Sequence, residues 1–146
     1  MAVVDAYRPE VARRASYRCE YCYYPEAASS TPLEVDHIIP EAKGGVTALD
    51  NLALCCRSCN LHKYVKIDAT DPVSGETTPL FNPRIQHWQE HFRLDPDTGA
   101  IQGVTPSGRA TEGALVLNSP HAIATRQLLI RLGLMEGNWA EVRTDR

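Results

Sequence analysis

The side chains best suited to chemistry in this sequence lie between residues 19 and 63, in two chemically distinct sets. One set contains only thiols, and the other combines oxygen-bearing side chains with an imidazole. Thiolates favour zinc, whereas carboxylate and amide oxygens favour hard ions such as Mg²⁺. The spacing therefore predicts two metal sites, a structural one and one with the composition of a phosphodiester-cleaving centre. The candidates are Cys19, Cys22, Cys56 and Cys59 in the first set, and Asp36, His37, Asn51 and Asn60 in the second.

The thiol set consists of two Cys-x-x-Cys pairs separated by the 33 residues between Cys22 and Cys56. Four sulfur ligands leave no open position for water, so a zinc ion held by them would be structural. Such a site contributes about 10–16 kcal/mol of apparent folding free energy in small finger peptides. A redox motif is the alternative, but it needs only one pair. The fifth cysteine, Cys55, is expected to pack as a small apolar residue, although it could replace Cys56 at poorer spacing to Cys59.

The second set depends on a predicted strand–loop–strand–helix unit. A β-branched segment over 33–39 predicts a strand that ends at Pro40, and 52–55 predicts the returning strand. A helix is predicted from 56 to about 65, on which Asn60 and Lys63 share a face. Folding this helix over the strands would bring Asn60 near Asp36 and His37. Because adjacent strand residues point to opposite faces, these last two converge only where the strand end bends.

The remaining elements are less distinct and predict an α+β protein. A short helix is expected over 9–16, and 71–79 is expected to be a turn-rich connection. Asn82 is predicted to cap a helix that carries Ile85, Trp88 and Phe92 as an apolar stripe. A hairpin is predicted around 97–99, and a last helix from Ser119 to Gly133.

Composition restricts the possible classes of protein. The chain has 146 residues, of which 43% are hydrophobic, and its net charge is −3. This length suits one compact unit, with a core at 1–70 and an extension at 71–146 packed on it. The charge argues against a protein that coats nucleic acid non-specifically. Because no signal peptide or membrane-spanning segment is recognisable, a soluble, cytoplasmic protein is expected.

The order and spacing of these motifs resemble the HNH endonuclease family with its ββα-metal finger. The resemblance covers about residues 17–66. It rests on Val35-Asp36-His37-Ile38-Ile39-Pro40, Gly44-Gly45 and Asp50-Asn51-Leu52, between Cys-x-x-Cys and Cys-x-x-Cys-Asn-x-x-Lys. The third motif residue, often His in the family, is Asn60 here. The segments 80–84 and 88–92 are similar to an extension found in a prokaryotic branch of these nucleases.

The resemblance implies an enzyme that hydrolyses DNA phosphodiester bonds. Asp36 and Asn60 would hold one Mg²⁺ or Mn²⁺ ion. His37 would take a proton from the attacking water, because an imidazole with an ordinary pKa of about 6.5 suits a base near neutrality. Asn51 would hydrogen-bond across the loop and orient His37. The family expectation is a product with a 5′-phosphate and a 3′-hydroxyl.

Basic residues near the predicted helix are candidates for contact with DNA phosphates. These are Arg57, Lys63 and Lys66, of which Lys63 is also a candidate catalytic residue. The alternative function is a zinc-stabilised nucleic-acid-binding module without cleavage activity. Intact Asp36, His37, Asn51 and Asn60 argue against it, because binding alone requires none of them. The oligomeric state is open between monomer and dimer, and one active centre would make one nick per encounter.

Overall fold

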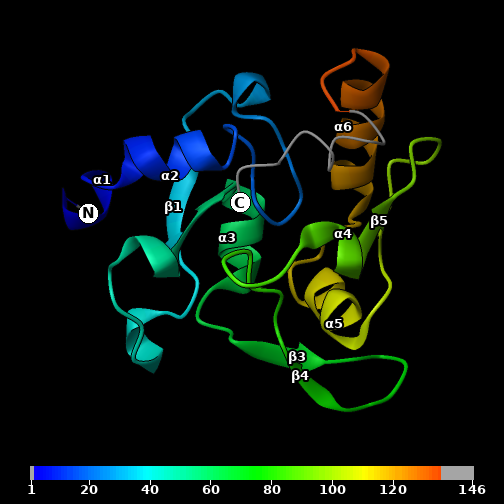
Figure 1. Cartoon of the computed structure of the whole chain (residues 1–146). Coiled ribbons are helices and arrows are strands. Elements are labelled where there is room, and N and C mark those ends of the chain that lie inside the picture. The colour runs from blue at the N-terminus through cyan, green and yellow to red at the C-terminus, as the bar shows by residue number, and fades with distance from the viewer. Residues whose placement is uncertain (1, 136–146) are drawn as a thin grey trace.

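The computed structural model describes residues 2–135 of the chain (Figure 1). The first part begins with two helices, followed by the loop that carries Cys19 and Cys22, and then a β-hairpin and a helix. The elements in this part are α1 (Ala2–Asp5), α2 (Arg8–Arg14), η1 (Glu26–Ala28), β1 (Glu34–His37), η2 (Glu41–Lys43), η3 (Leu49–Asn51), β2 (Leu52–Cys55) and α3 (Arg57–Lys63). The predicted strand–loop–strand–helix order is confirmed, although β1 and α3 are shorter than expected.

The hairpin of β1 and β2 is antiparallel, with Glu34 opposite Cys55 and His37 opposite Leu52. All four residues of β2 are buried, because α2 packs against it. The face of β1 is covered by α3. Glu34 and Asp36 of β1 are only partly exposed, and their side chains contact α3 in a seam between strand and helix.

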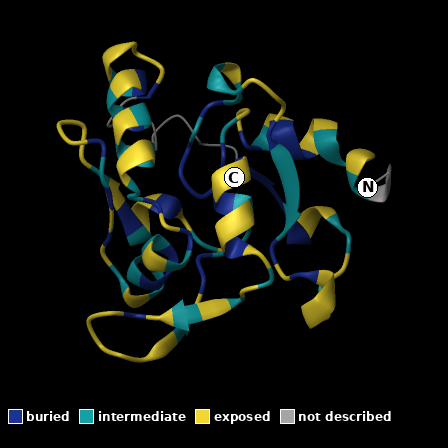
Figure 2. Ribbon diagram, turned by 180° about the vertical axis from the view of Figure 1, so that it is seen from behind, coloured by how far each residue is buried: buried dark blue, intermediate teal, exposed yellow. Residues whose placement is uncertain are grey.

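The second part of the described chain contains two more hairpins and three helices. Its elements are β3 (Asp68–Thr70), β4 (Thr77–Pro79), α4 (Trp88–His91), β5 (Phe92–Leu94), β6 (Ile101–Gly103), α5 (Pro106–Ala114) and α6 (Pro120–Arg131). α5 packs on β3, β4 and β6, and so joins the two hairpins. Figure 2 shows the exposed tip of the β3–β4 hairpin and the exposed outer face of α3. The expected extension reaches residue 146, but residues 136–146 lie outside the described part.

An aromatic cluster connects the two parts. Trp88 is 2% exposed and stacks on Phe92 at 4.8 Å and on Tyr23 at 5.2 Å between ring centroids. Its Nε1 donates a hydrogen bond of 2.9 Å to the backbone oxygen of Tyr21. The ring of Phe81 meets the ring of Tyr21 edge-on. Residues of the extension thus pack directly on the loop that holds the first cysteine pair.

The buried carboxylate of Glu20 adds a polar connection at the same place. One of its oxygens accepts a hydrogen bond from the Leu54 backbone nitrogen at 3.0 Å, and the other is paired with Arg84 of the extension. Glu20 is 1% exposed, so its charge is stabilised by these partners and not by water. The loop, β2 and the extension are therefore held together at one residue.

The prediction of a helix starting at Pro83 is wrong. Asn82 instead forms a turn, in which its side-chain oxygen accepts a hydrogen bond from the Arg84 backbone nitrogen at 2.9 Å. A helix begins only at Trp88, and Phe92 already belongs to β5. Ile85 is consequently 79% exposed and forms no apolar stripe. The predicted hairpin around 97–99 and the helix from Pro120 are confirmed.

The segment expected as a turn-rich connection also differs, because 77–79 pairs with 68–70 as the β3–β4 hairpin. The helix α5 was not predicted. No helix within residues 2–135 is long and apolar enough to cross a membrane.

Candidate metal centres and active site

The four cysteines of the two Cys-x-x-Cys pairs meet in space. Their sulfur atoms all lie within 4.8 Å of one another, and all four residues are buried. The Sγ of Cys56 also accepts a hydrogen bond from the Cys59 backbone nitrogen at 3.4 Å, so the first turn of α3 is capped by a member of the cluster. The start of the helix and the position of two sulfur atoms are therefore fixed together. The donor set and its spacing fit a single tetrahedral ion such as zinc.

Crowding of the thiols shows why a cation suits this cluster. Contact with Cys19 raises the pKa of both Cys22 and Cys59 well above its usual range. Several thiolates at such distances repel one another unless a cation compensates them. The neighbouring Cys55 is buried but does not belong to the group of four. Burial raises the pKa of the Cys55 thiol, as expected for a packed neutral side chain.

Two of the polar contacts between β1 and α3 involve the predicted metal ligands Asn60 and Asp36. Nearer the start of β1, Asn60 Nδ2 donates a hydrogen bond of 2.6 Å to Glu34 Oε1. Two residues along the same face of β1, Asp36 Oδ2 lies 3.0 Å from Lys63 Nζ. Asn60 and Lys63 are three residues apart on α3, so the helix presents both to the strand. The structure brings the predicted ligand Asn60 to Glu34, and the predicted ligand Asp36 to Lys63.

Asp36 has the properties of a carboxylate that a cation would stabilise. Its side chain is 11% exposed, and burial raises its pKa despite the attraction of Lys63. Although Oδ2 is close to the Lys63 ammonium, it accepts no well-aligned hydrogen bond. A buried carboxylate oxygen without such a partner fits a hard divalent ion.

Lys63 is 1% exposed, which differs from the surface position that a phosphate contact requires. Its Nζ also donates a hydrogen bond of 3.0 Å to the backbone oxygen of His37. One ammonium group thus contacts Asp36 through its side chain and His37 through its main chain. Both residues are tied to the last turn of α3.

His37 lies at the end of β1 and faces the loop that joins the strands. Its Nε2 is 2.7 Å from Thr47 Oγ1. The loop is closely packed here: a side chain at Gly45 would meet the backbone oxygen of Ile39 at 1.7 Å, so only glycine fits. Residues 36 and 37 contact different neighbours, as strand alternation requires.

Asn51 closes this loop with its side-chain amide. Its Oδ1 accepts a hydrogen bond from the Ile39 backbone nitrogen at 2.9 Å, and its Nδ2 donates to the backbone oxygens of Ile39 and Val46 at 3.0 and 2.8 Å. All three bonds cross the loop that begins directly after His37. These hydrogen bonds fix the main chain that follows His37, and they go to Ile39 and Val46 and not to the His37 ring.

Two basic candidates for phosphate contact lie on the surface. The Arg57 side chain is 75% exposed and pairs with Glu34 Oε2 at 3.2 Å. Lys66 is exposed, and its Nζ donates a hydrogen bond of 2.7 Å to the His62 backbone oxygen. Their exposure leaves both accessible to a backbone phosphate.

Sequence reasoning missed two residues that contact the candidate site, Glu34 and Thr47. Glu34 lies two positions before Asp36, and strand alternation places both on one face. That signal was available in the sequence. Thr47 lies in a loop whose path depends on Asn51 and on close packing at Gly45, and no local pattern predicts such a path.

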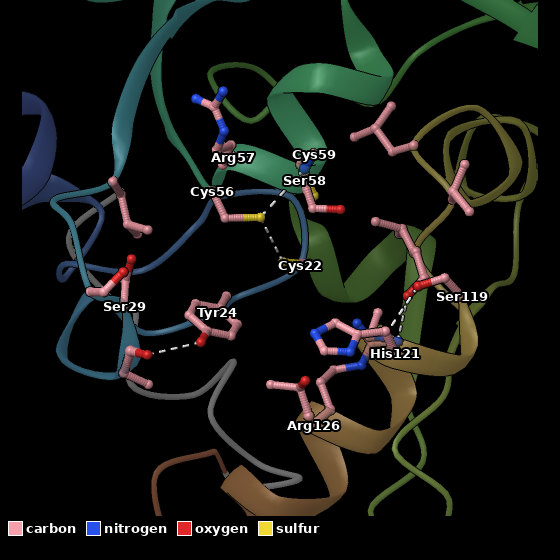
Figure 3. A pocket seen from close by; sticks show the side chains of 18 residues that line it. Cys22, Tyr24, Ser29, Cys56, Arg57, Ser58, Cys59, Ser119, His121 and Arg126 are labelled. Carbon is pink, nitrogen blue, oxygen red and sulfur yellow. Dashed lines mark hydrogen bonds between the residues drawn. The ribbon is translucent and has the colours of Figure 1, made fainter.

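A cavity of about 430 Å³ opens beside the cysteine cluster. Figure 3 shows it between Cys22 and Cys56 on one side and His121 and Arg126 of α6 on the other. Asp36, His37, Asn51, Asn60 and Lys63 do not line it. This cavity therefore lies beside the cysteine cluster and not at the seam.

Comparison with known proteins supports the family resemblance of this segment. The profile of the HNH endonuclease family matches residues 19–66. The CRISPR-associated endonuclease Cas9 of Corynebacterium diphtheriae is 28% identical over 89 residues, which cover 58% of this chain. The match spans only 8% of that much longer protein. No solved structure matches significantly. Residues 19–66 thus match the HNH endonuclease family, and they fold as a ββα finger around four cysteines positioned to bind a metal.

Proposed function

We propose that this protein is a metal-dependent endonuclease that hydrolyses phosphodiester bonds in DNA. The observation that carries the proposal is the polar seam between β1 and α3, inside a domain whose sequence matches the HNH endonucleases. A module that only binds nucleic acid does not require a largely buried carboxylate such as that of Asp36 next to the histidine His37.

Asp36 and Asn60 are the proposed ligands of one Mg²⁺ or Mn²⁺ ion. Both supply oxygen atoms, and both lie in the same seam, Asp36 on β1 and Asn60 on α3. When bound, such an ion stabilises the negative charge that develops on the phosphate and on the leaving oxygen. The four-cysteine cluster is proposed to hold zinc in a purely structural role, because its four sulfur atoms would leave no coordination position open for water.

His37 is the proposed general base. If Nε2–H donates to Thr47 Oγ1, the acceptor nitrogen is Nδ1, and we assign the proton transfer to that atom. Water attacks phosphorus, its proton moves to Nδ1, and the bond from phosphorus to the 3′ oxygen breaks. The products are a 5′-phosphate and, after protonation of the leaving oxygen, a 3′-hydroxyl. Positioned base catalysis contributes about 10²–10⁴-fold to the rate.

Lys63 and Asn51 are proposed to position these groups. Lys63 is buried, and we therefore assign it to holding Asp36 and the His37 peptide in place of the expected contact with phosphate. Asn51 fixes the loop after His37 through its three hydrogen bonds. Exposed Arg57 and Lys66 are the proposed contacts with backbone phosphate.

We also propose that the extension beginning at residue 71 braces the nuclease core as part of one unit. Trp88 and Arg84 contact the loop between Cys19 and Cys22, and this loop supplies half of the cysteine cluster. An extension that held this loop in place would keep Cys19 and Cys22 positioned beside Cys56 and Cys59 of the finger.

A plasmid-nicking assay tests the function directly. Purified wild type is expected to convert supercoiled plasmid to the open circle with Mg²⁺ or Mn²⁺, and not with EDTA. His37→Ala should reduce the rate by about 10²–10⁴-fold while zinc content and DNA binding are retained. Thr47→Val, which removes the hydroxyl beside Nε2, should lower the rate by less than His37→Ala.

The matched control is His62→Ala, which changes an exposed histidine of α3 outside the seam and should cut normally. Zinc-loaded wild type that binds DNA but never nicks it would favour the binding-module alternative. If His37→Ala cut DNA as fast as wild type, only the assignment of His37 as the base would be refuted.

A further inference from the structure

The residue of the seam without an assigned role is Glu34. It lies on the same face of β1 as Asp36 and contacts α3 through both of its carboxylate oxygens. We propose that Glu34 is a positioning residue, which orients the Asn60 amide so that the amide oxygen is the atom offered to the catalytic cation. The inference rests on the proposed function, and it adds a residue beyond those that the motif supplies.

The argument begins with the chemistry of an amide and a carboxylate. An asparagine side chain has one accepting and one donating end, and only the accepting oxygen can bind a divalent cation. An ionised carboxylate only accepts hydrogen bonds. The 2.6 Å contact between Asn60 and Glu34 Oε1 must therefore be made by Nδ2, because an amide oxygen at that distance would be repelled. The contact selects one of the two amide orientations and leaves Oδ1 on the other side.

Glu34 is itself held firmly enough to do this. Its second oxygen accepts a hydrogen bond of 3.2 Å from Arg57 Nη1, and Arg57 precedes Asn60 by three residues on α3. Both donors thus come from one side of a helix whose first turn is fixed by the cysteine cluster. The Glu34 side chain is 33% exposed and is less accessible than its Arg57 partner. A carboxylate attached to a paired strand and bound by two donors has little freedom to turn.

The charges of the seam agree with a supporting role for Glu34. Each carboxylate on this face of β1 forms an ion pair with a basic residue of α3, Asp36 with Lys63 and Glu34 with Arg57. With both oxygens of Glu34 bonded to α3, Asp36 is the carboxylate whose oxygen lacks an aligned donor. Partners that orient metal ligands typically change metal affinity by about 10–100-fold when they are removed.

The first experiment measures Mn²⁺ affinity by calorimetry on zinc-loaded, full-length protein, so the readout is independent of cleavage. Glu34→Ala is expected to weaken Mn²⁺ binding by about 10–100-fold. Glu34→Gln keeps an oxygen that can accept from Asn60, so its affinity should stay close to that of wild type. If Glu34 were a direct ligand through its charge, both variants would lose affinity equally, and the positioning role would be refuted. Zinc content and the thermal midpoint verify that each variant is folded.

The second experiment exchanges donor and acceptor. Asn60→Asp alone sets two carboxylates against each other and should weaken Mn²⁺ binding. Combined with Glu34→Gln, it restores a donor opposite an acceptor, so part of the affinity should return. Non-additivity in this double-mutant cycle measures the coupling of the two residues. Strict additivity would overturn the proposal.

The two proposals fail in different ways. Wild type that neither binds Mn²⁺ nor nicks plasmid overturns the proposed function, and the role of Glu34 with it. Wild type that nicks plasmid while Glu34→Ala keeps full Mn²⁺ affinity overturns only the role of Glu34.

Discussion

The finger (residues 19–66) and the chain after it (residues 67–135), which comprises β3 and the described part of the extension from residue 71, achieve order by different means. The finger consists mainly of two strands of four residues and a helix of seven, and its proposed metal ligands and base lie on β1 and α3. Elements of this size are marginal alone, because a two-stranded hairpin and a two-turn helix bury little apolar surface. The extension is longer and contains an aromatic stack, and its helices cover its hairpins.

This difference predicts how each region responds to a single substitution. In the finger, a few polar groups and four sulfur atoms fix both the fold and the site, so a single change there affects both. In the extension, stability is distributed over packing contacts, so a single change should reduce stability without removing a ligand. Cys59 and Lys63 belong to the first region, and Trp88 and Asp71 belong to the second.

The largest effect is expected on removing a sulfur ligand. Cys59→Ser should abolish metal binding at the cluster and unfold the finger, because structural zinc contributes about 10–16 kcal/mol in small finger peptides. Metal content by mass spectrometry and circular dichroism would measure the two losses together. Cys55→Ala is the matched control, since Cys55 is buried beside the cluster but is not one of the four. Wild type that keeps its fold after the metal is removed would contradict this view of the finger.

A smaller but still large effect is expected for Lys63→Met. The change leaves the Asp36 carboxylate buried without its cation, which typically costs about 3–5 kcal/mol in unfolding free energy. Chemical denaturation would measure it. Adding Asp36→Asn removes the stranded charge, so the double variant should recover much of the loss. Arg13→Met, which breaks an exposed ion pair with Glu10, provides the comparison and should cost at most about 1 kcal/mol.

The sequence predicted the finger well because its signals are local. Cys-x-x-Cys spacing predicts which sulfur atoms share an ion, and glycine, proline and asparagine mark the loop between the strands. Asn60 and Lys63 were placed correctly on one helical face. Their partners were not predicted, since contacts between strand and helix depend on tertiary packing. Burial of Lys63 was missed because a lysine near a predicted site is read as an exposed cation.

The extension was less readable because its elements are set by long-range contacts. The helix expected from Pro83 does not form, because the Asn82 side chain accepts a hydrogen bond from the Arg84 backbone nitrogen and stabilises a turn instead. The spacing of Ile85, Trp88 and Phe92 resembled a helical apolar stripe and gave no sign of this turn. Trp88 faces the core because it contacts two residues more than sixty positions earlier. Its Nε1 donates a hydrogen bond to the Tyr21 backbone oxygen, and its ring stacks on Tyr23. The helix predicted from Ser119 is confirmed as α6, and the Ser119 side chain caps it by accepting a hydrogen bond from the Ala122 backbone nitrogen.

An intermediate effect is expected for Trp88→Phe, which tests whether the extension braces the finger. The aromatic ring is kept, but the Tyr21 backbone oxygen loses its donor, which typically costs about 1–3 kcal/mol. Zinc should also transfer faster to a competing chelator, because the loop between Cys19 and Cys22 is held less firmly. Ile85→Ala, at an exposed position nearby, should change neither measurement. Lower stability with an unchanged rate of zinc transfer would separate the extension from the finger.

The smallest effect concerns the ion pair of Asp71 and Arg109, which joins the β3–β4 hairpin to α5. Hydrogen bonds from Arg109 at 2.8 and 3.0 Å hold the pKa of Asp71 well below its usual range. A lowered carboxyl pKa means that the pair stabilises the fold above the ordinary Asp value of about 3.9 and that this contribution disappears as the pH falls through the native pKa. Asp71→Asn should therefore lower the thermal midpoint at neutral pH, and the difference from wild type should narrow below about pH 4. The rate of plasmid nicking at a temperature where both proteins are folded should be unchanged, because the pair lies outside the seam. A pH-independent difference would show that Asp71 acts through its turn hydrogen bonds to Val73 and Ser74 and not through its charge.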